Sequence, residues 1–135
     1  PGAAGGGGVG VAKPVELEPG GTYEDLDLAG HELSELDLSD AKFVRCTLAD
    51  AKVAALLAPG AQFRECRFLR CRFAHADFRE AVFARCGFTD AEGHAGVEIA
   101  FSQLDQARFE TCDLSFADIS RSSLWAVVFK ESKMK

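Results

Sequence analysis

The chain has 135 residues, of which 47% are apolar, and a formal net charge of −6 at pH 7. This length fits a single domain. The acidic balance argues against nonspecific nucleic-acid binding, which needs a basic surface. No run of 18 apolar residues and no apolar signal-peptide core is present, so we expect neither a membrane-spanning segment nor a secretion signal.

The chain opens with a Gly/Ala tract, PGAAGGGGVGVAK, over residues 1–13. This composition predicts a flexible linker or tail, and the first residue is Pro rather than Met, so we expect a trimmed piece of a longer chain. Residues 14–22, PVELEPGGT, place two apolar residues before a Pro-Gly-Gly turn. We predict that they form an N-terminal cap over the repeat that follows, because the end of a stacked repeat exposes apolar groups and strand edges.

A five-residue period begins at Tyr23 and is clearest in residues 61–91, where Phe occupies every fifth position and Ala or Cys lies two residues before each Phe. Such a period makes no stripe on an α-helix, and on a strand it would alternate between the two faces. Both problems disappear if the chain bends once per five residues. The central residue and the small residue two before it then point inward, which predicts a solenoid.

The Ala-x-Phe and Cys-x-Phe units, together with the segments AHADF, CDLSFADI and ELSELDLSDAKF, resemble the pentapeptide-repeat family over residues 23–135. The resemblance implies an all-β fold, a right-handed quadrilateral β-helix with four pentapeptides per coil. Counting central residues from Tyr23 then gives just under six coils.

Two segments interrupt the period. In VAALLAPG, Leu56 stands at a small position and Ala58 at a central one, an exchange that conserves volume. In TDAEGHAGVEI, one extra residue moves the central position from Gly93 to Ile99, which predicts a loop insertion at residues 92–98.

The segment around this loop, residues 86–118, resembles the first-loop region of the quinolone-resistance pentapeptide proteins. The similar features are a Cys-x-Phe unit, a short Glu/Gly loop, Phe-Ser and then CDLSFAD. Those proteins bind type II DNA topoisomerases, and their loops contribute to binding. This chain departs from them in having fewer coils, one clear loop and no visible C-terminal capping helix.

The five cysteines all fall at the inward small position: Cys46, Cys66, Cys71, Cys86 and Cys112. Three of them are twenty residues apart and should stack. Because side chains of parallel, in-register strands point the same way, we expect reduced thiols, which suits a cytoplasmic location. No Cys-x-x-Cys pair or histidine partner accompanies them, so we expect no metal site and no cofactor.

Outward charges recur every twenty residues and predict ladders of ion pairs along the rod, in the columns Asp25, Arg45, Glu65, Arg85 and Asp50, Arg70, Asp90. The fourth side of each expected coil differs because it is mainly acidic. We predict that it contacts a partner together with two loop residues, and the residues proposed for this contact are Asp37, Asp40, Asp77, Glu80, Glu98, Asp118, Glu92 and His94.

No catalytic constellation stands out, so the chain is not expected to be an enzyme. One hypothesis is a protein–protein interaction module whose acidic side mimics DNA. The resemblance implies a type II topoisomerase, DNA gyrase or topoisomerase IV, as its partner, with no direct nucleic-acid or membrane contact. The alternative is a scaffold segment of a larger bacterial protein, for example a secretion-associated one, in which the acidic side only keeps the surface soluble.

The last coil is incomplete, ending after Leu124, Phe129 and Met134. Apolar residues also occupy outward positions nearby: Phe101, Phe116, Trp125 and Val128. Several apolar side chains near one open end indicate an assembly surface, so we predict an end-to-end homodimer. The alternative is that further chain after Lys135 covers this end.

Overall fold

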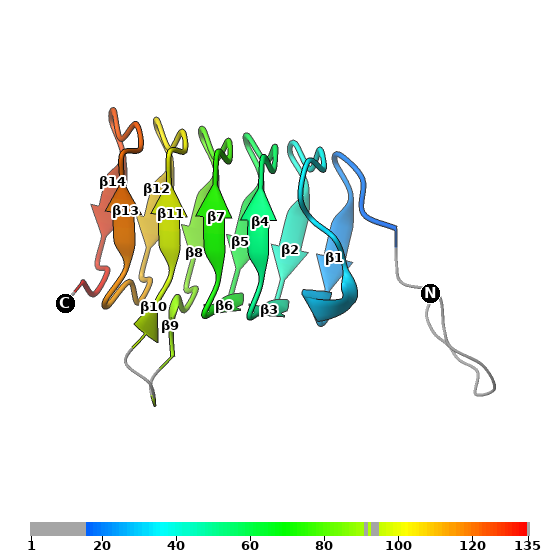
Figure 1. The fold of residues 1–135 in the computed structure, drawn as a ribbon, viewed down its shortest axis with the longest axis horizontal. Coiled ribbons are helices and arrows are strands. Elements are labelled where there is room, and N and C mark those ends of the chain that lie inside the picture. The colour runs from blue at the N-terminus through cyan, green and yellow to red at the C-terminus, as the bar shows by residue number, and fades with distance from the viewer. Residues whose placement is uncertain (1–15, 91, 93–94, 135) are drawn as a thin grey trace.

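The computed structural model describes residues 16–90, 92 and 95–134. In these residues the chain winds into a rod of stacked coils, with β1 near one end and β14 near the other (Figure 1). Strands on the same side of successive coils pair in parallel and in register, as where Phe43 of β2 lies opposite Phe63 of β5. The four-sided β-helix predicted from the sequence is therefore confirmed.

Each coil has four sides, which we number in chain order. Side 1 carries β1 (Thr22–Glu24), β2 (Lys42–Val44), β5 (Gln62–Arg64), β8 (Val82–Ala84), β12 (Arg108–Glu110) and β14 (Val128–Lys130). Side 2 carries the 3-10 turn η1 (Leu28–Gly30), β3 (Thr47–Ala49) and β6 (Arg67–Leu69). Side 3 carries β4 (Lys52–Ala54), β7 (Arg72–Ala74), β11 (Glu98–Ala100) and β13 (Asp118–Ser120). Side 4 is joined by single parallel bridges through Asp37, Leu57, Asp77, Gln103 and Ser123.

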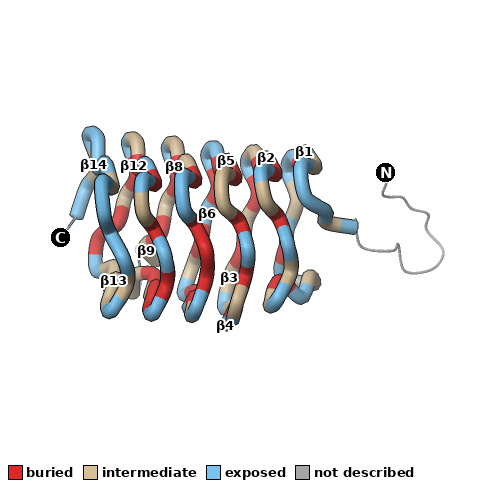
Figure 2. Tube along the Cα trace, turned by 90° about the horizontal axis from the view of Figure 1, so that it is seen from above, coloured by how far each residue is buried: buried red, intermediate tan, exposed pale blue. Residues whose placement is uncertain are grey.

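The strands are short because the chain turns a corner after each one. The middle residue of a strand points inward while its two neighbours point outward, and it is buried in the strands before β13, as in the Lys52–Ala54 strand β4. The next residue adopts a left-handed backbone, as Ala55 does with φ 59°. Eighteen described non-glycine residues share this conformation, so the corners are tolerated without glycine at nearly every turn. Figure 2 shows the resulting alternation of buried and exposed chain around every coil.

Aromatic rings fill the inside of the rod. On side 1 an unbroken column of parallel rings runs through all the coils, with centroids 4.8–5.2 Å apart: Tyr23, Phe43, Phe63, Phe83, Phe109 and Phe129. Rings from adjacent sides meet this column edge to face, as Phe78 meets Phe83 at 5.6 Å. Aromatic pairs favour both arrangements, so the five-residue period sets the core geometry.

The register changes at one insertion, and here the sequence-based prediction was wrong. A hairpin of β9 (Thr89–Asp90) and β10 (Ala95–Gly96) leaves the rod at the corner between sides 2 and 3. Ile99 then lies opposite Phe73 of β7, so six residues are inserted instead of one. The prediction had treated Gly93 as a central residue, and Gly93 itself lies outside the described residues. A glycine has no side chain to fill the core, whereas Val97 and Ile99 are both buried.

This insertion shifts every later residue by one side relative to the prediction. The repeats from Tyr23 to Leu124 make five complete coils, and Phe129 and Met134 begin a sixth. The described rod is therefore about a quarter of a coil shorter than the sequence count.

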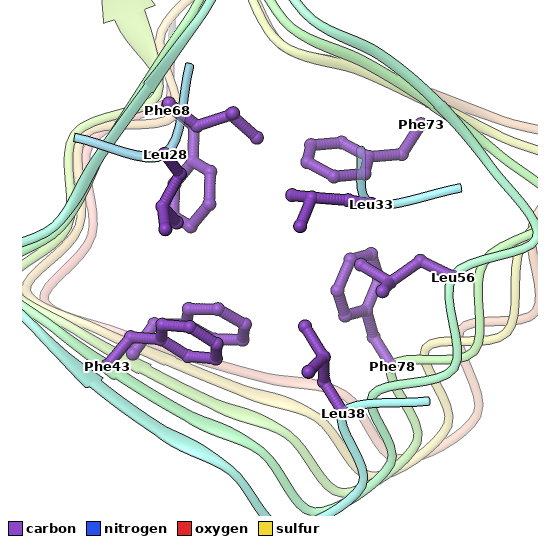
Figure 3. Close-up of a pocket in the computed structure, with 10 residues that line it drawn as sticks. Leu28, Leu33, Leu38, Phe43, Leu56, Phe68, Phe73 and Phe78 are labelled. Atoms are coloured by element: carbon purple, nitrogen blue, oxygen red, sulfur yellow. The ribbon is translucent and has the colours of Figure 1, made fainter. Parts of the chain in front are cut away.

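The exchange of Leu56 and Ala58 is confirmed, because both side chains are buried. Leu56 points toward the axis beside Phe78 and takes the space that a central residue would fill (Figure 3). The packing leaves an apolar cavity of only about 20 Å³ among the leucines and phenylalanines of the first coils. An apolar space that holds about one water-sized probe is no ligand site. No helix in the described part of the chain is long and apolar enough to cross a membrane.

Replacing Phe73 by Ala should lower the free energy of unfolding by about 3–5 kcal/mol, because Phe73 is buried against Phe68 and Phe78 and its removal leaves a cavity. Chemical denaturation measures the loss. Phe101→Ala is the control, because this ring is 49% exposed. Similar losses for the two variants would contradict the assignment of Phe73 to the core.

Replacing Ala55 by Gly should leave the stability unchanged or raise it by up to about 1 kcal/mol. The left-handed corner costs an alanine roughly 1–2 kcal/mol, which exceeds the roughly 0.4–1 kcal/mol of extra chain entropy that glycine brings to the unfolded state. The neighbouring Ala54→Gly in β4 should instead be destabilising by about 0.5–1 kcal/mol. Equal effects in thermal melts would mean that the corner is not strained.

Candidate protein-binding surface

Side 4 and its corner with side 1 carry the densest acidic charge on the rod. Four of the acidic residues predicted for this surface lie here, namely Asp37, Asp40, Asp77 and Glu80. The structure adds Asp105, which the sequence analysis missed because the shifted register had placed it elsewhere. We call these five residues the acidic face. One basic residue, Arg79, lies beside them on the same side.

Glu98 and Asp118 do not belong to this face. Both residues lie on side 3. Glu98 of β11 lies between Asp118 of β13 on one side and Arg72 of β7 on the other. The Arg72 guanidinium lies 3.5 Å from the Glu98 carboxylate, so part of this charge is compensated. The prediction that Glu98 and Asp118 lie on the fourth side was wrong, because the insertion is six residues long and moves both of them to side 3.

Arg79 compensates only one of the five carboxylates of the acidic face, because its guanidinium is bound to Asp77. Its Nε and Nη2 donate to the two carboxylate oxygens of Asp77 at 2.9 and 2.7 Å. Burial alone would raise the pKa of Asp77, but the hydrogen bonds and charge of Arg79 hold that pKa below its usual value. Asp77 therefore remains ionised at neutral pH. The Asp37 carboxylate accepts hydrogen bonds from Ser39, and the Asp105 carboxylate accepts hydrogen bonds from Ser123 and Trp125.

The acidic face also contains two exposed apolar side chains. Leu57 lies between Asp37 and Asp77 and is 44% exposed. Trp125 lies at the far end of the same side, is 67% exposed, and donates its backbone N–H to Asp105 Oδ1 at 2.9 Å. A surface of this kind offers both charge and apolar contact area to a protein partner.

The hairpin does not join this surface, contrary to the expectation that loop and acidic side act together. It leaves from the corner between sides 2 and 3, which is diagonally opposite the corner between sides 4 and 1. Glu92 is exposed there, with its N–H bonded to Asp90 Oδ1 at 3.0 Å, and His94 lies outside the described residues. Gly96 is required in this hairpin, since a Cβ atom would lie 2.3 Å from the Phe116 carbonyl.

The ladders of ion pairs are confirmed on two other corners, between sides 1 and 2 and between sides 2 and 3. Arg45 Nε contacts Asp25 at 2.8 Å, and Arg70 bridges Asp50 and Asp90 at 2.6 and 2.9 Å. Hydrogen bonds from Arg70 lower the pKa of Asp50. The carboxylates of these corners are paired with arginines, and the Asp50, Arg70 and Asp90 column keeps one net negative charge.

The residues predicted for assembly are exposed, but they do not form one patch. Phe101 lies at the corner of sides 3 and 4, with His75 stacked at 5.5 Å and the Arg121 guanidinium 5.5 Å from its ring. Phe116 lies at the hairpin corner, Trp125 on side 4 and Val128 on side 1. The final layer of the described rod is more continuous, because Leu124, Phe129 and Met134 are 43, 38 and 56% exposed.

All five cysteines are free, inward and buried, as predicted. Besides occupying the inward small position, each thiol lies against two backbone carbonyls. Cys86 Sγ donates to the carbonyls of Phe63 and Ala84, 3.3 and 3.5 Å away. Ser122 makes the corresponding bonds to Ile99 and Ser120. The inward small position therefore accepts a short side chain with a donor hydrogen as well as an alanine, as at Ala41 and Ala61.

Among the described residues, no group of three or more His, Cys, Asp or Glu side chains is arranged to hold a metal ion. Burial raises the pKa of the Cys71 thiol, so this cysteine is not an activated nucleophile.

Comparison with known proteins agrees with the architecture. Residues 60–92 match the pentapeptide repeats family, with eight copies. These residues therefore contain the repeats of that family. The chain is similar in fold to a pentapeptide repeat protein, Rfr23, from the cyanobacterium Cyanothece 51142, with a TM-score of 0.67 and 12% identity over 88% of this chain and 87% of that one.

Structures of QnrB1, a plasmid-mediated fluoroquinolone resistance protein, align less closely. One trypsin-treated form gives a TM-score of 0.32 at 12% identity, covering 89% of this chain and 92% of that one. No curated protein matches the chain. The comparisons therefore identify the pentapeptide-repeat fold, and the partner of this chain has to be inferred from its own surface.

Replacing Cys86 by Ser should leave the stability nearly unchanged, because a hydroxyl can keep both carbonyl bonds, as Ser122 does. Cys86→Ala removes the donor and should cost about 0.5–1.5 kcal/mol. Urea denaturation under reducing conditions measures both. An alanine variant as stable as the serine variant would show that only the size of this residue matters.

Proposed function

We propose that this chain is a non-catalytic protein-binding module that presents its acidic face to a basic surface of a partner. The observation that carries the proposal is the concentration of carboxylates on side 4 and its adjoining corner, with the guanidinium of Arg79 already bound by Asp77. The two charged corner ladders are internally paired, so the acidic face is where the unbalanced charge of the rod gathers.

The rod suits such a role because its backbone pairing already fixes the positions of the acidic residues before a partner binds. Asp37 and Asp77 are bridge residues two coils apart, and both are fixed by parallel backbone pairing to Leu57. A preorganised surface loses less conformational entropy on binding than flexible side chains on a loop. A basic groove that normally accepts the phosphates of DNA is the partner chemistry that fits best, and a type II topoisomerase, DNA gyrase or topoisomerase IV, is the candidate.

A scaffold role in a larger bacterial protein is the second candidate. The observation that favours it is the mixed surface outside the acidic face, where a ladder of paired charges such as Asp25, Arg45, Glu65 and Arg85 gives no charge excess for a partner. On this alternative the carboxylates serve solubility. Purified topoisomerase distinguishes the two roles.

Excess protein should inhibit supercoiling by purified DNA gyrase, and inhibition should weaken as salt rises from low to physiological ionic strength. The double reversal Asp40→Lys/Glu80→Lys should abolish it, because both corner residues belong to the acidic face. Glu98→Lys/Asp118→Lys changes the net charge equally on side 3 and is the matched control, expected to retain inhibition. Unchanged supercoiling with the unmodified protein would remove the topoisomerase proposal and leave the scaffold role.

Homodimer formation through the last layer is a separate proposal that rests on the exposed Leu124, Phe129 and Met134. Light scattering of this chain at high micromolar concentration should give the dimer mass, and Met134→Glu should give the monomer by placing a charge in the apolar contact. Trp125→Glu on side 4 should weaken the dimer less. A monomeric mass for the unmodified chain would exclude this interface.

A further inference from the structure

Four of the five buried thiols form a continuous column inside the rod. Cys46, Cys66, Cys86 and Cys112 occupy the inward small position of side 2 in successive coils. Backbone bonds fix their register, because Arg67, Gly87 and Asp113 each donate an N–H to the carbonyl of the cysteine in the coil before, at 3.0 Å. Cys71 lies apart on side 3, where the same position in the adjacent coils holds Ala51 and Val97.

Successive thiols of this column are immediate neighbours. Cys66 Sγ lies 3.5 Å from the Phe43 carbonyl and Cys86 Sγ lies 3.3 Å from the Phe63 carbonyl, so successive thiols repeat the same geometry one coil apart. Adjacent parallel strands lie about 4.7–4.9 Å apart, so stacked sulfur atoms are separated by about that distance. A linear sulfur–metal–sulfur unit with bonds near the 2.3 Å of a zinc–thiolate bond spans about 4.6 Å.

The column therefore offers two sulfur ligands in line at each gap between the thiols of consecutive coils, and no third sulfur ligand. This set does not suit Zn²⁺, which takes four ligands in a tetrahedron. It suits a soft monovalent ion that accepts two thiolates in a line, and thiolates are the ligands that select Cu(I). We propose that the cysteine column of side 2 is a binding site for soft monovalent metal ions of the Cu(I) class, each held between the sulfur atoms of consecutive coils.

The charge balance favours filling the column as a chain. The first ion displaces the protons of two thiols and leaves a unit with one net negative charge inside the rod. Each further ion shares a thiolate already formed and displaces one more proton, so it adds no net charge.

The test uses the full chain, reduced and refolded with Ag(I) as the probe, so that burial of the thiols does not limit entry. Native mass spectrometry should find up to three silver ions per chain, one for each gap between the four thiols of the column. Cys66→Ser should reduce this to one, because only the Cys86–Cys112 gap remains. The serine variant is expected to fold, since Ser132 occupies the next place in this column with bonds to Phe109 and Lys130.

Cys71→Ser is the matched control. It removes an equally buried thiol with equivalent carbonyl bonds to Leu48 and Leu69, but one outside the column, and should leave the silver count at its full value. Zn(II) under the same conditions should not be retained. Failure of the unmodified chain to retain silver, equal losses in the Cys66 and Cys71 variants, or equal retention of Zn(II) would each overturn the proposal.

Discussion

The structure depends on parallel, in-register pairing between each coil and the next. Outside the corner turns, backbone N–H groups reach carbonyls one coil away, as from Gln62 to Ala41 and from Val82 to Ala61. This pairing places like residues above one another along the rod. The ring column, the thiol column and the charge ladders all follow from that single constraint, because each is a five-residue unit repeated at the coil spacing.

The same constraint explains why the fold could be predicted and where the prediction failed. Central residues such as Phe63 and Phe83 are large and apolar, so their period is visible in the sequence. At the hairpin the period alone is ambiguous, because a glycine or alanine fits either a small inward position or a turn. Which of Gly93 and Ile99 completes side 3 depends on which side chain fills the core, and strand pairing to Phe73 decides this.

The acidic face was only partly predictable for that reason. Residues before the insertion, such as Asp37 and Asp77, were assigned to the correct side, whereas Glu98 and Asp118 were assigned to the wrong one and Asp105 was missed. The hydrogen-bonding role of the cysteines could not be read from the period, because a small inward residue fits whether or not it donates. The serines at positions 102, 122 and 132 share the position, and each hydroxyl donates to a backbone carbonyl in the structure.

The stacking of coils has a consequence for how the rod opens. Each coil is held mainly by the coils on either side, and interior layers such as that of Phe109 are fully covered. A partner lying lengthwise on side 4 would touch one coil after another from Asp37 to Trp125. Such a partner would hold neighbouring coils together, and local opening of a coil would be suppressed while it is bound.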